Sequence, residues 1–208
     1  MLTTHSVKKF IDILASNAPA PGGGSVSALN GALAAGLISM VCQLSLSHKE
    51  LAVYEIDIKK VLDQTLVLKE QLVDLIDKDT QAFNGVMMAY RMKKSTPEQF
   101  EERSQAIQSA FKEAVNIPLL IATRSSEVLN LAVMITKHFN TNTASDMGVG
   151  AYCAMVGIRG ALMNVDINLS SIKDKVFVDK IQTSKNNIIK NIDQQMDIVY
   201  QAVTKIIT

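Results

Sequence analysis

The chain has 208 residues, of which 48% are hydrophobic and 20% are charged. This balance is typical of globular proteins, excludes a disordered chain and is sufficient for one domain, residues 1–208, with a substantial core. The net charge is +1 and aromatic residues make up only 5%, so we expect no nucleic-acid partner, because neither a basic surface nor a set of stacking rings is available.

The cysteines and histidines predict neither a disulfide framework nor a metal site. Cys42 and Cys153 lie in separate apolar segments without paired spacing, and His5, His48 and His138 have no metal-like spacing with carboxylates. We expect two reduced, packed thiols. The N-terminus lacks the basic region and apolar stretch of a secretory signal peptide. A cytoplasmic protein is therefore predicted.

The N-terminal part predicts two helices separated by a turn. Thr4 or Ser6 is a suitable cap for a first helix that reaches Leu14 with apolar residues at helical spacing. The helix must end before residues 19–25, Pro-Ala-Pro-Gly-Gly-Gly-Ser, because two prolines and three glycines cannot continue it. A second helix is predicted from Ser25 to Ser47.

This second helix lies within a segment, Ile13 to His48, that contains no Asp, Glu, Lys or Arg. Its residues 26–46 are numerous enough to cross a bilayer. Asn30, Gln43 and five serines oppose that interpretation, and small residues at spacings of three and four favour close packing between helices. We therefore expect a buried central helix and no membrane association.

The middle of the chain predicts further long helices. Residues 49–93 form one amphipathic helix or two helices end to end. Thr96 is a suitable N-cap for a helix that begins at Pro97. Pro118 is expected to kink or end this helix, with another helix over 119–137.

A polar loop at 140–145 precedes a second glycine- and alanine-rich helix that opens at Asp146. In the tail, 176–207, isoleucines and valines recur at intervals of seven, four and three, which indicates a seam against a partner helix. No segment alternates as a strand would. The predicted fold is an all-α, single-domain bundle of long helices that includes buried glycine- and alanine-rich helices.

Asp79 is the first candidate for chemistry. It lies four residues after Leu75 and four before Phe83, on the apolar stripe of its helix. A desolvated carboxylate there has a raised pKa, which suits an acid/base catalyst near neutral pH. The alternative is an edge position where Asp79 binds a neighbouring arginine or a helix N-terminus.

The glycine turn is the second candidate. Gly22, Gly23 and Gly24 expose backbone N–H groups and lead into a helix N-terminus, which favours an anion or a carbonyl oxygen. No Lys-Ser/Thr pair follows, so the turn is not a P-loop. The alternative is a tight turn between helices with Ser25 as N-cap.

Other polar residues allow two interpretations each. Asn164 and Asn168, one turn apart among apolar neighbours, either bind backbone of another helix or bind a heterocyclic ligand. Ser145 and Asp146 are possible helix caps. The basic segment 91–94 is either a solvated helix end or a surface that steers a polycarboxylate substrate.

Taken together, these segments resemble the cyclodeaminase/cyclohydrolase family of folate one-carbon metabolism over the full length. That family includes the C-terminal half of formiminotransferase-cyclodeaminase and stand-alone bacterial methenyltetrahydrofolate cyclohydrolases. The segments that carry the resemblance are residues 19–29, 79–83, 140–146 and 164–169, followed by Asp174. The family usually has a Gly-Asn-Pro-Asn type of turn before Ser-Asp, where this chain has Phe139-Asn140-Thr141-Asn142. We expect that difference to affect the rim of the pocket more than the fold.

The resemblance implies an all-helical homodimer built on long antiparallel helices, with a folate cleft near the subunit interface. It implies one of two reactions, with a tetrahydrofolate derivative as the substrate and with no bound cofactor or metal. Cyclodeamination converts 5-formiminotetrahydrofolate to 5,10-methenyltetrahydrofolate and ammonia. Cyclohydrolysis converts 5,10-methenyltetrahydrofolate to 10-formyltetrahydrofolate.

Roles follow from placing residue chemistry on the family segments. Asp79 is the expected general acid/base, and Asp146 is expected to orient water or stabilise the developing cation. The expected substrate-binding residues are Gly22, Gly23, Gly24, Ser25, Asn142, Asn164 and Asn168. A different class remains open, a non-catalytic dimerisation scaffold that kept the fold. The polar residues favour catalysis, because packing requires none of them.

Overall fold

A computed structural model describes all residues, 1–208, and every regular element in it is a helix. The helices are α1 (Val7–Leu14), α2 (Gly23–Leu46), α3 (Glu55–Arg91), α4 (Pro97–Ile135), α5 (Ala144–Leu169), α6 (Lys175–Ile189) and α7 (Ile192–Ile207). Short 3-10 helices are η1 (Leu2–Thr4), η2 (Lys49–Tyr54) and η3 (Thr141–Thr143). The predicted all-α class is confirmed.

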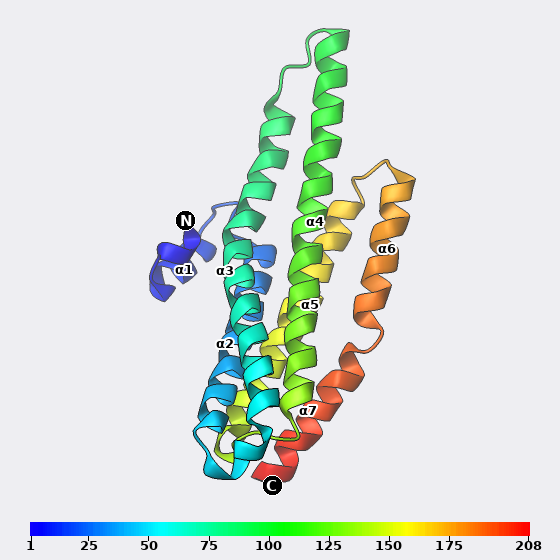
Figure 1. Cartoon of the computed structure of the whole chain (residues 1–208). Coiled ribbons are helices and arrows are strands. Elements are labelled where there is room, and N and C mark those ends of the chain that lie inside the picture. Colours follow the sequence, from blue (N-terminus) through cyan, green and yellow to red (C-terminus); the bar gives the residue numbers. More distant parts are fainter.

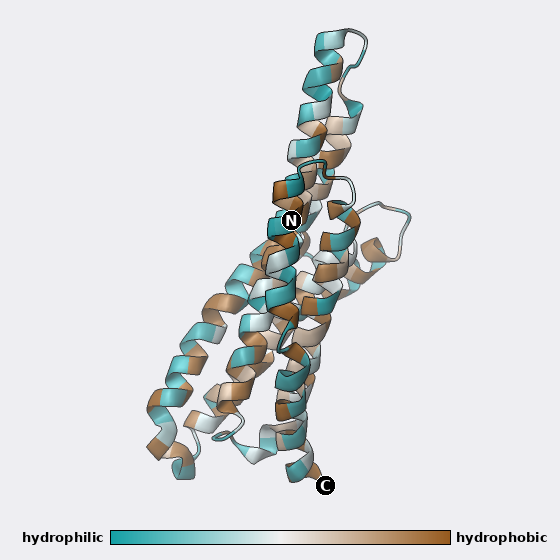
Figure 2. Ribbon diagram, turned by 90° about the vertical axis from the view of Figure 1, so that its right-hand side faces the viewer, coloured by the Kyte–Doolittle hydropathy of each residue, from teal (hydrophilic) through white to brown (hydrophobic).

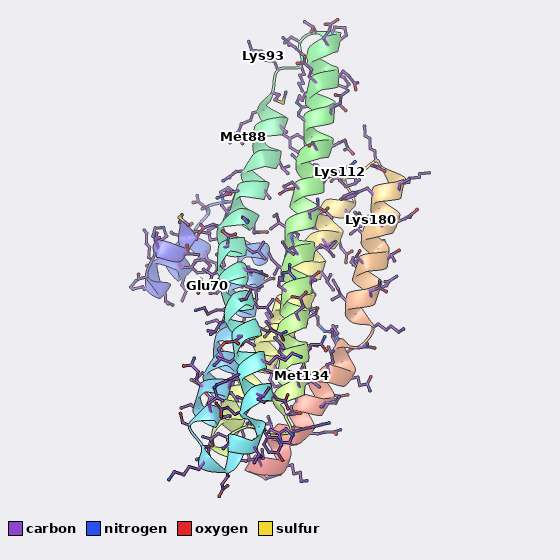
Figure 3. All side chains as sticks on the ribbon, in the orientation of Figure 1. Glu70, Met88, Lys93, Lys112, Met134 and Lys180 are labelled. Atoms are coloured by element: carbon purple, nitrogen blue, oxygen red, sulfur yellow. The ribbon has the colours of Figure 1, made fainter.

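Four long helices form the body of the molecule. The helices α2 and α4 each pack against both α3 and α5, so that the four make a bundle, and α7 covers α4 and α5 at one end. The antiparallel pair α3 and α4 continues beyond the other helices as a hairpin, while α6 lies to one side (Figure 1). Figure 2 shows that the hairpin tip is largely hydrophilic, and Figure 3 shows Lys93 at its turn.

The predicted caps are present where helices begin at the surface. Ser6 accepts a hydrogen bond from the N–H of Lys9 at the start of α1, with 3.2 Å between the two atoms. Thr96 accepts from the N–H of Gln99 at the start of α4, with Pro97 as the first helical residue. Both cap predictions are confirmed.

The start of α2 differs from the prediction. The helix begins at Gly23 with Gly22 as the N-cap, so Ser25 lies inside the first turn and is fully buried. Its hydroxyl is 2.9 Å from the carbonyl oxygen of Ile76 on α3. The prediction of Ser25 as a cap is wrong because its hydroxyl bonds the neighbouring helix and not the backbone of its own.

Pro118 does not end a helix. The two helices predicted over 97–117 and 119–137 are a single helix, α4, with Pro118 buried inside it. A proline deprives the carbonyl four residues earlier of its helical donor, and here that carbonyl belongs to Ala114. The side-chain Nδ2 of Asn168 donates to this oxygen at 2.9 Å. The orphaned acceptor is therefore satisfied from α5.

The tail does not form one continuous helix. It divides at Lys190 and Asn191 into α6 and α7. The seam of α7, with Val199 and Val203 buried, packs against α5 and α4 of the same chain. The predicted seam is therefore present in α7.

The helices α2 and α5 approach each other most closely through small residues. A Cβ on Gly157 would lie 2.7 Å from Ser125 Oγ and 3.2 Å from the backbone nitrogen of Gly31. A Cβ on Gly31 would lie 2.5 Å from the same oxygen. Three helices, α2, α4 and α5, thus meet where no side chain larger than hydrogen fits on two of them.

Three segments are long and apolar enough to cross a membrane by length and composition, namely Gly23–Leu46, Pro97–Ile135 and Thr141–Leu169. In α2, however, 61% of the most apolar window is buried inside the molecule. The central position predicted for this helix is confirmed, with Ala28, Ala35 and Ile38 fully buried. Both cysteines are free, and burial raises the pKa of the Cys42 thiol to about 12.

We predict that Gly157→Ala destabilises the bundle. The added methyl group meets Ser125 and the backbone of Gly31, so overpacking should exceed the helix-propensity gain and lower the free energy of unfolding by about 1–2 kcal/mol. Urea denaturation followed by circular dichroism measures this change. The matched control is Gly85→Ala in α3, where a Cβ meets nothing within 4 Å and stability should stay equal or rise. Equal stability of both variants would contradict the close packing described here.

Candidate active site

A cavity of about 360 Å³ lies where α2 begins, between α3, α4 and the C-terminal part of α5. Its volume falls in the range of small-molecule sites. Its wall is partly apolar, with contributions from Phe83, Val86 and Phe111. The residues predicted from the sequence that line it are Gly22, Gly23, Gly24, Asp79, Asn164 and Asn168. One cavity thus contains most of the candidate residues, from three separate parts of the chain.

Asp79 lies directly against the backbone of the glycine turn. A Cβ on Gly24 would lie 2.0 Å from Oδ1 of Asp79 and 2.5 Å from its carboxyl carbon. Real Cβ contacts are never this short, so residue 24 must be glycine for Asp79 to occupy its position. Gly22, by contrast, has open space where a Cβ would be. The glycine turn therefore serves to admit the carboxylate to the start of α2.

Ser25 connects Asp79 to the backbone of α3. Its Oγ lies 3.0 Å from Oδ2 of Asp79, 2.9 Å from the carbonyl oxygen of Ile76 and 3.2 Å from Oγ1 of Thr80. A hydroxyl has one proton to donate. When Asp79 is ionised, Ser25 can donate to it. When Asp79 is protonated, it can donate to Ser25 while Ser25 donates to Ile76. The arrangement accommodates both protonation states without moving a heavy atom.

The pKa of Asp79 is raised above that of an exposed aspartate. Burial is the largest cause, because desolvation disfavours the charged form, and hydrogen bonds from the side chain and backbone of Ser25 partly oppose it. No arginine or lysine forms an ion pair with this carboxylate. A half-buried carboxylate with a raised pKa in a cavity has the properties of a general acid/base.

Asn164 and Asn168 present acceptors on the same cavity. Nδ2 of Asn164 donates to the carbonyl oxygen of Gly160 at 2.8 Å. Nδ2 of Asn168 donates to the carbonyl oxygens of Ala114 and Asn164 at 2.9 and 3.0 Å. The alternative of binding backbone of another helix is therefore confirmed for Nδ2 of Asn168, which reaches α4, whereas Nδ2 of Asn164 binds backbone of its own helix. Each Oδ1 atom forms no hydrogen bond within the chain, so it can accept one from the N–H groups of a ligand.

Asn142 and Asp146 do not lie in this cavity. Asp146 is in the first turn of α5, eighteen residues before Asn164, which corresponds to five turns and about 27 Å along the helix. The N-cap of α5 is Thr143, so the interpretation of Ser145 and Asp146 as a cap is wrong. Asp146 is half-buried and forms no hydrogen bond or ion pair in this chain. Asn142 is exposed in η3.

Some cavity residues were not identified from the sequence. Phe111 and Ala114 of α4 line it, although neither was singled out from the sequence as a site residue. No pattern in the sequence distinguishes an aromatic side chain that faces a cavity from one that faces a core. Pro19 and Ala20 also line it, as part of the segment before the glycine turn.

Comparisons with known proteins agree with this geometry. The family described as formiminotransferase-cyclodeaminase matches residues 6–187. A methenyltetrahydrofolate cyclohydrolase from Methylorubrum extorquens is 38% identical over 180 residues, which cover 86% of each chain. A formimidoyltransferase-cyclodeaminase from Gallus gallus is 33% identical over 184 residues, and this chain spans 34% of that longer protein.

A solved structure has the same fold. The crystal structure of formiminotetrahydrofolate cyclodeaminase from Thermotoga maritima superposes with a TM-score of 0.89 at 26% identity, and the match covers 100% of both chains. The sequence match across most of the chain and the structural match across all of it lead to one conclusion. The chain belongs to the formiminotransferase-cyclodeaminase family.

Proposed function

We propose that this protein is a folate one-carbon enzyme that acts on the carbon carried by N5 of tetrahydrofolate. The first reaction proposed is the hydrolysis of 5,10-methenyltetrahydrofolate to 10-formyltetrahydrofolate, as the name of the Methylorubrum relative describes for that protein. The second is cyclodeamination of 5-formiminotetrahydrofolate, as the name of the Thermotoga structure suggests. The observation that carries both is the half-buried carboxylate of Asp79 against the glycine turn, with Ser25 as its hydrogen-bond partner.

For hydrolysis, Asp79 serves first as a base and then as an acid. Water adds to the cationic methenyl carbon, and Asp79 takes one proton from it. The bond between this carbon and N5 then breaks, Asp79 returns a proton to N5, and the hydroxyl proton leaves to solvent as the formyl C=O forms. Ser25 changes its hydrogen bond from Asp79 to Ile76 when Asp79 is protonated. The same carboxylate therefore acts in both steps.

For cyclodeamination, the same groups move a proton from N10 to the departing nitrogen. The formimino group reacts as its protonated cation, and N10 attacks its carbon. Asp79 accepts the proton of N10 and passes it to the NH2 group, and the bond between this nitrogen and the carbon then breaks, which releases ammonia and leaves the methenyl cation. Both reactions pass through a tetrahedral carbon between two nitrogens. The position of Asp79 beside such a carbon is the common requirement.

Binding is assigned to the groups around Asp79. The Oδ1 atoms of Asn164 and Asn168 accept hydrogen bonds from the N–H groups along the pterin edge. Gly22 forms the N-cap, and the N–H groups of Gly23 and Gly24 in the first turn of α2 have no helical partner. These N–H groups are suited to the oxygen that develops on the reacting carbon.

We also propose a homodimer formed through α2 and α5. These neighbouring helices each carry several exposed, large apolar side chains, here called the α2/α5 face, and α2 carries no charge. Met163 and Ile167 are each 71% exposed. The residues of the α2/α5 face are Leu33, Met40, Leu44, Val149, Tyr152, Val156, Met163 and Ile167. Monomeric proteins rarely expose so extended an apolar surface.

A two-fold axis on this face would bring the two groups of site residues together. Val156 lies midway between Asp146 and Ile167, which borders the cavity. An axis that passes beside Val156, perpendicular to α5, reverses the helix of the partner. Because Asp146 and Asn164 lie on the same side of α5, the partner's Asp146 would face Asn164. The partner's Asn142 would approach with it.

We further expect a cytoplasmic protein with no bound cofactor, no membrane association and no nucleic-acid partner. The two free thiols agree with a reducing compartment. The scaffold alternative does not account for a half-buried carboxylate without an ionic partner or for a glycine at position 24 that admits it.

We predict that Asp79→Asn removes most of the activity. The substitution keeps the shape of the side chain but removes the proton acceptor, so turnover should fall by roughly 100- to 10,000-fold. Loss of the near-ultraviolet chromophore of 5,10-methenyltetrahydrofolate measures hydrolysis, and its appearance from 5-formiminotetrahydrofolate measures cyclodeamination. The control is Asp74→Asn, an exposed residue of the same helix paired with Lys78, which should retain activity. A folded Asp79→Asn protein with normal turnover would refute the assignment, and native protein inactive in both assays would favour the scaffold.

The second prediction concerns pH. The hydrogen bond from Ser25 lowers the raised pKa of Asp79, so Ser25→Ala should raise that pKa further. At a given pH on the acid side, less of the carboxylate is ionised, and the rate should be several-fold lower there and recover as pH rises. A pH profile of kcat/KM measures the displacement of the acid limb to higher pH. Ser27→Ala is the control, since Ser27 donates only to the carbonyl of Gly23 in its own helix. A displacement to lower pH would contradict the role of Ser25.

The third prediction tests the shared site by mixing variants. Asp79→Asn and Asp146→Asn homodimers should each be impaired. Random reassociation gives half heterodimers, each with one intact and one doubly altered site, so about a quarter of native activity should return. The control is a mixture of Asp79→Asn with itself, which should regain nothing. No recovery in the mixture would indicate that Asp79 and Asp146 act in a site formed by a single protomer. Full activity of the Asp146→Asn homodimer would show that Asp146 is not part of the site.

A further inference from the structure

A second, smaller cavity of about 250 Å³ adjoins the proposed active site. It lies between the end of α3, the first part of α4 and the loop after α5. Phe111 lines both cavities, and its ring meets that of Tyr90 edge to face, with 6.1 Å between the centroids. The two cavities therefore share a wall that is aromatic.

This second cavity contains cations without acidic partners. Arg103 and Lys173 line it, no aspartate or glutamate does, and neither cation forms an ion pair in the chain. By contrast, Lys112 nearby is paired with Asp174. A half-buried guanidinium without a carboxylate partner in the chain is suited to bind a carboxylate of a ligand.

The guanidinium of Arg103 and the backbone of Lys173 are held in position by other contacts. Arg103 donates from Nε and Nη2 to the carbonyl oxygen of Tyr90, at 3.2 and 3.1 Å, and its guanidinium carbon lies 5.6 Å from the centroid of that ring. Two of its five N–H groups are used. Gln108 binds the carbonyl of Ser171 and the N–H of Lys173, which fixes the loop against α4. The cavity is thus a preformed one.

The spacing suits an elongated substrate. Tyr90 lies eleven residues after Asp79 on α3, or about 16 Å along the helix. The aminobenzoyl ring and its amide separate the reacting nitrogen of a tetrahydrofolate from its glutamate carboxylates by on the order of 10 Å, from ordinary bond lengths. The long side chains of Arg103 and Lys173 span the remaining distance between the second cavity and the carboxylates. Phe83 and Phe111 of the first cavity lie between, where an aminobenzoyl ring would pass.

We propose that Arg103 and Lys173 bind the glutamate carboxylates of the folate substrate, while its aminobenzoyl ring packs against Phe111. This inference rests on the proposed function, since it identifies where the other end of that substrate lies. The basic residues at the hairpin tip, such as Lys93 in Figure 3, lie farther out and are not part of it.

The kinetic test compares 5,10-methenyltetrahydrofolate with its pteroate analogue, which lacks the glutamate. In native protein, loss of the glutamate should raise KM by about tenfold or more and leave kcat within about twofold, because charged hydrogen bonds are lost far from Asp79. Arg103→Gln and Lys173→Gln should raise KM for the complete substrate by a similar factor and leave KM for the analogue unchanged. The control, Lys180→Gln on α6 (Figure 3), should behave as native protein. Equal increases for both substrates, or none, would overturn the proposal.

A binding test separates this proposal from the proposed function. N-(4-aminobenzoyl)-glutamate, titrated by calorimetry, should bind native protein and bind Arg103→Gln about tenfold more weakly, whether or not turnover is observed. Arg103→Lys should bind with intermediate affinity. Lys173→Gln provides the same comparison should Arg103→Gln fail to fold. Equal binding to native protein and these variants, or no binding to native protein, would exclude the subsite.

Discussion

The contact between the backbone of Gly24 and the carboxylate of Asp79 is the constraint on which the site depends. It brings the N-terminus of α2 against the middle of α3, with no space for a side chain between them. Burial raises the pKa of Asp79, and Ser25, the next residue of α2, lies within hydrogen-bond distance of it. A close approach at one residue therefore fixes the position of the proposed catalytic group and the partner beside it.

Sequence patterns predicted the features that depend on neighbouring residues. The caps of α1 and α4 follow from local hydrogen bonds of Ser6 and Thr96, and the apolar stripe around Asp79 follows from helical periodicity. The all-α class and the family resemblance were also accessible. The glycine turn was recognised as important, but the reason for Gly24, the carboxylate beside it, depends on residues 55 positions apart.

Features that depend on contacts between helices were not predictable. Pro118 was expected to end or kink a helix, because nothing in its neighbourhood reveals that Asn168 supplies the missing donor. The alternative that Ser25 caps its own helix could not be rejected from the sequence, because the sequence does not reveal the carbonyl of Ile76 on α3 beside it. Asp79 and Asp146 were assigned to one site, although about 27 Å of helix separates Asp146 from the cavity. A sequence contains no distances between residues. In the proposed homodimer, the partner's Asp146 reaches the cavity that this chain's own Asp146 does not.

Asn168 has a double role that links the proposed site to the integrity of α4. Its Nδ2 completes the hydrogen bonding of a helix that a proline interrupts, and the remaining Oδ1 is available to a ligand. The two residues form a pair across α4 and α5, in which the proline creates the need and the asparagine meets it. A relative that replaces Pro118 by an ordinary residue removes that need, and its position 168 becomes free to diverge. Substitutions at these two positions should therefore be correlated during evolution, even though their side chains belong to different helices.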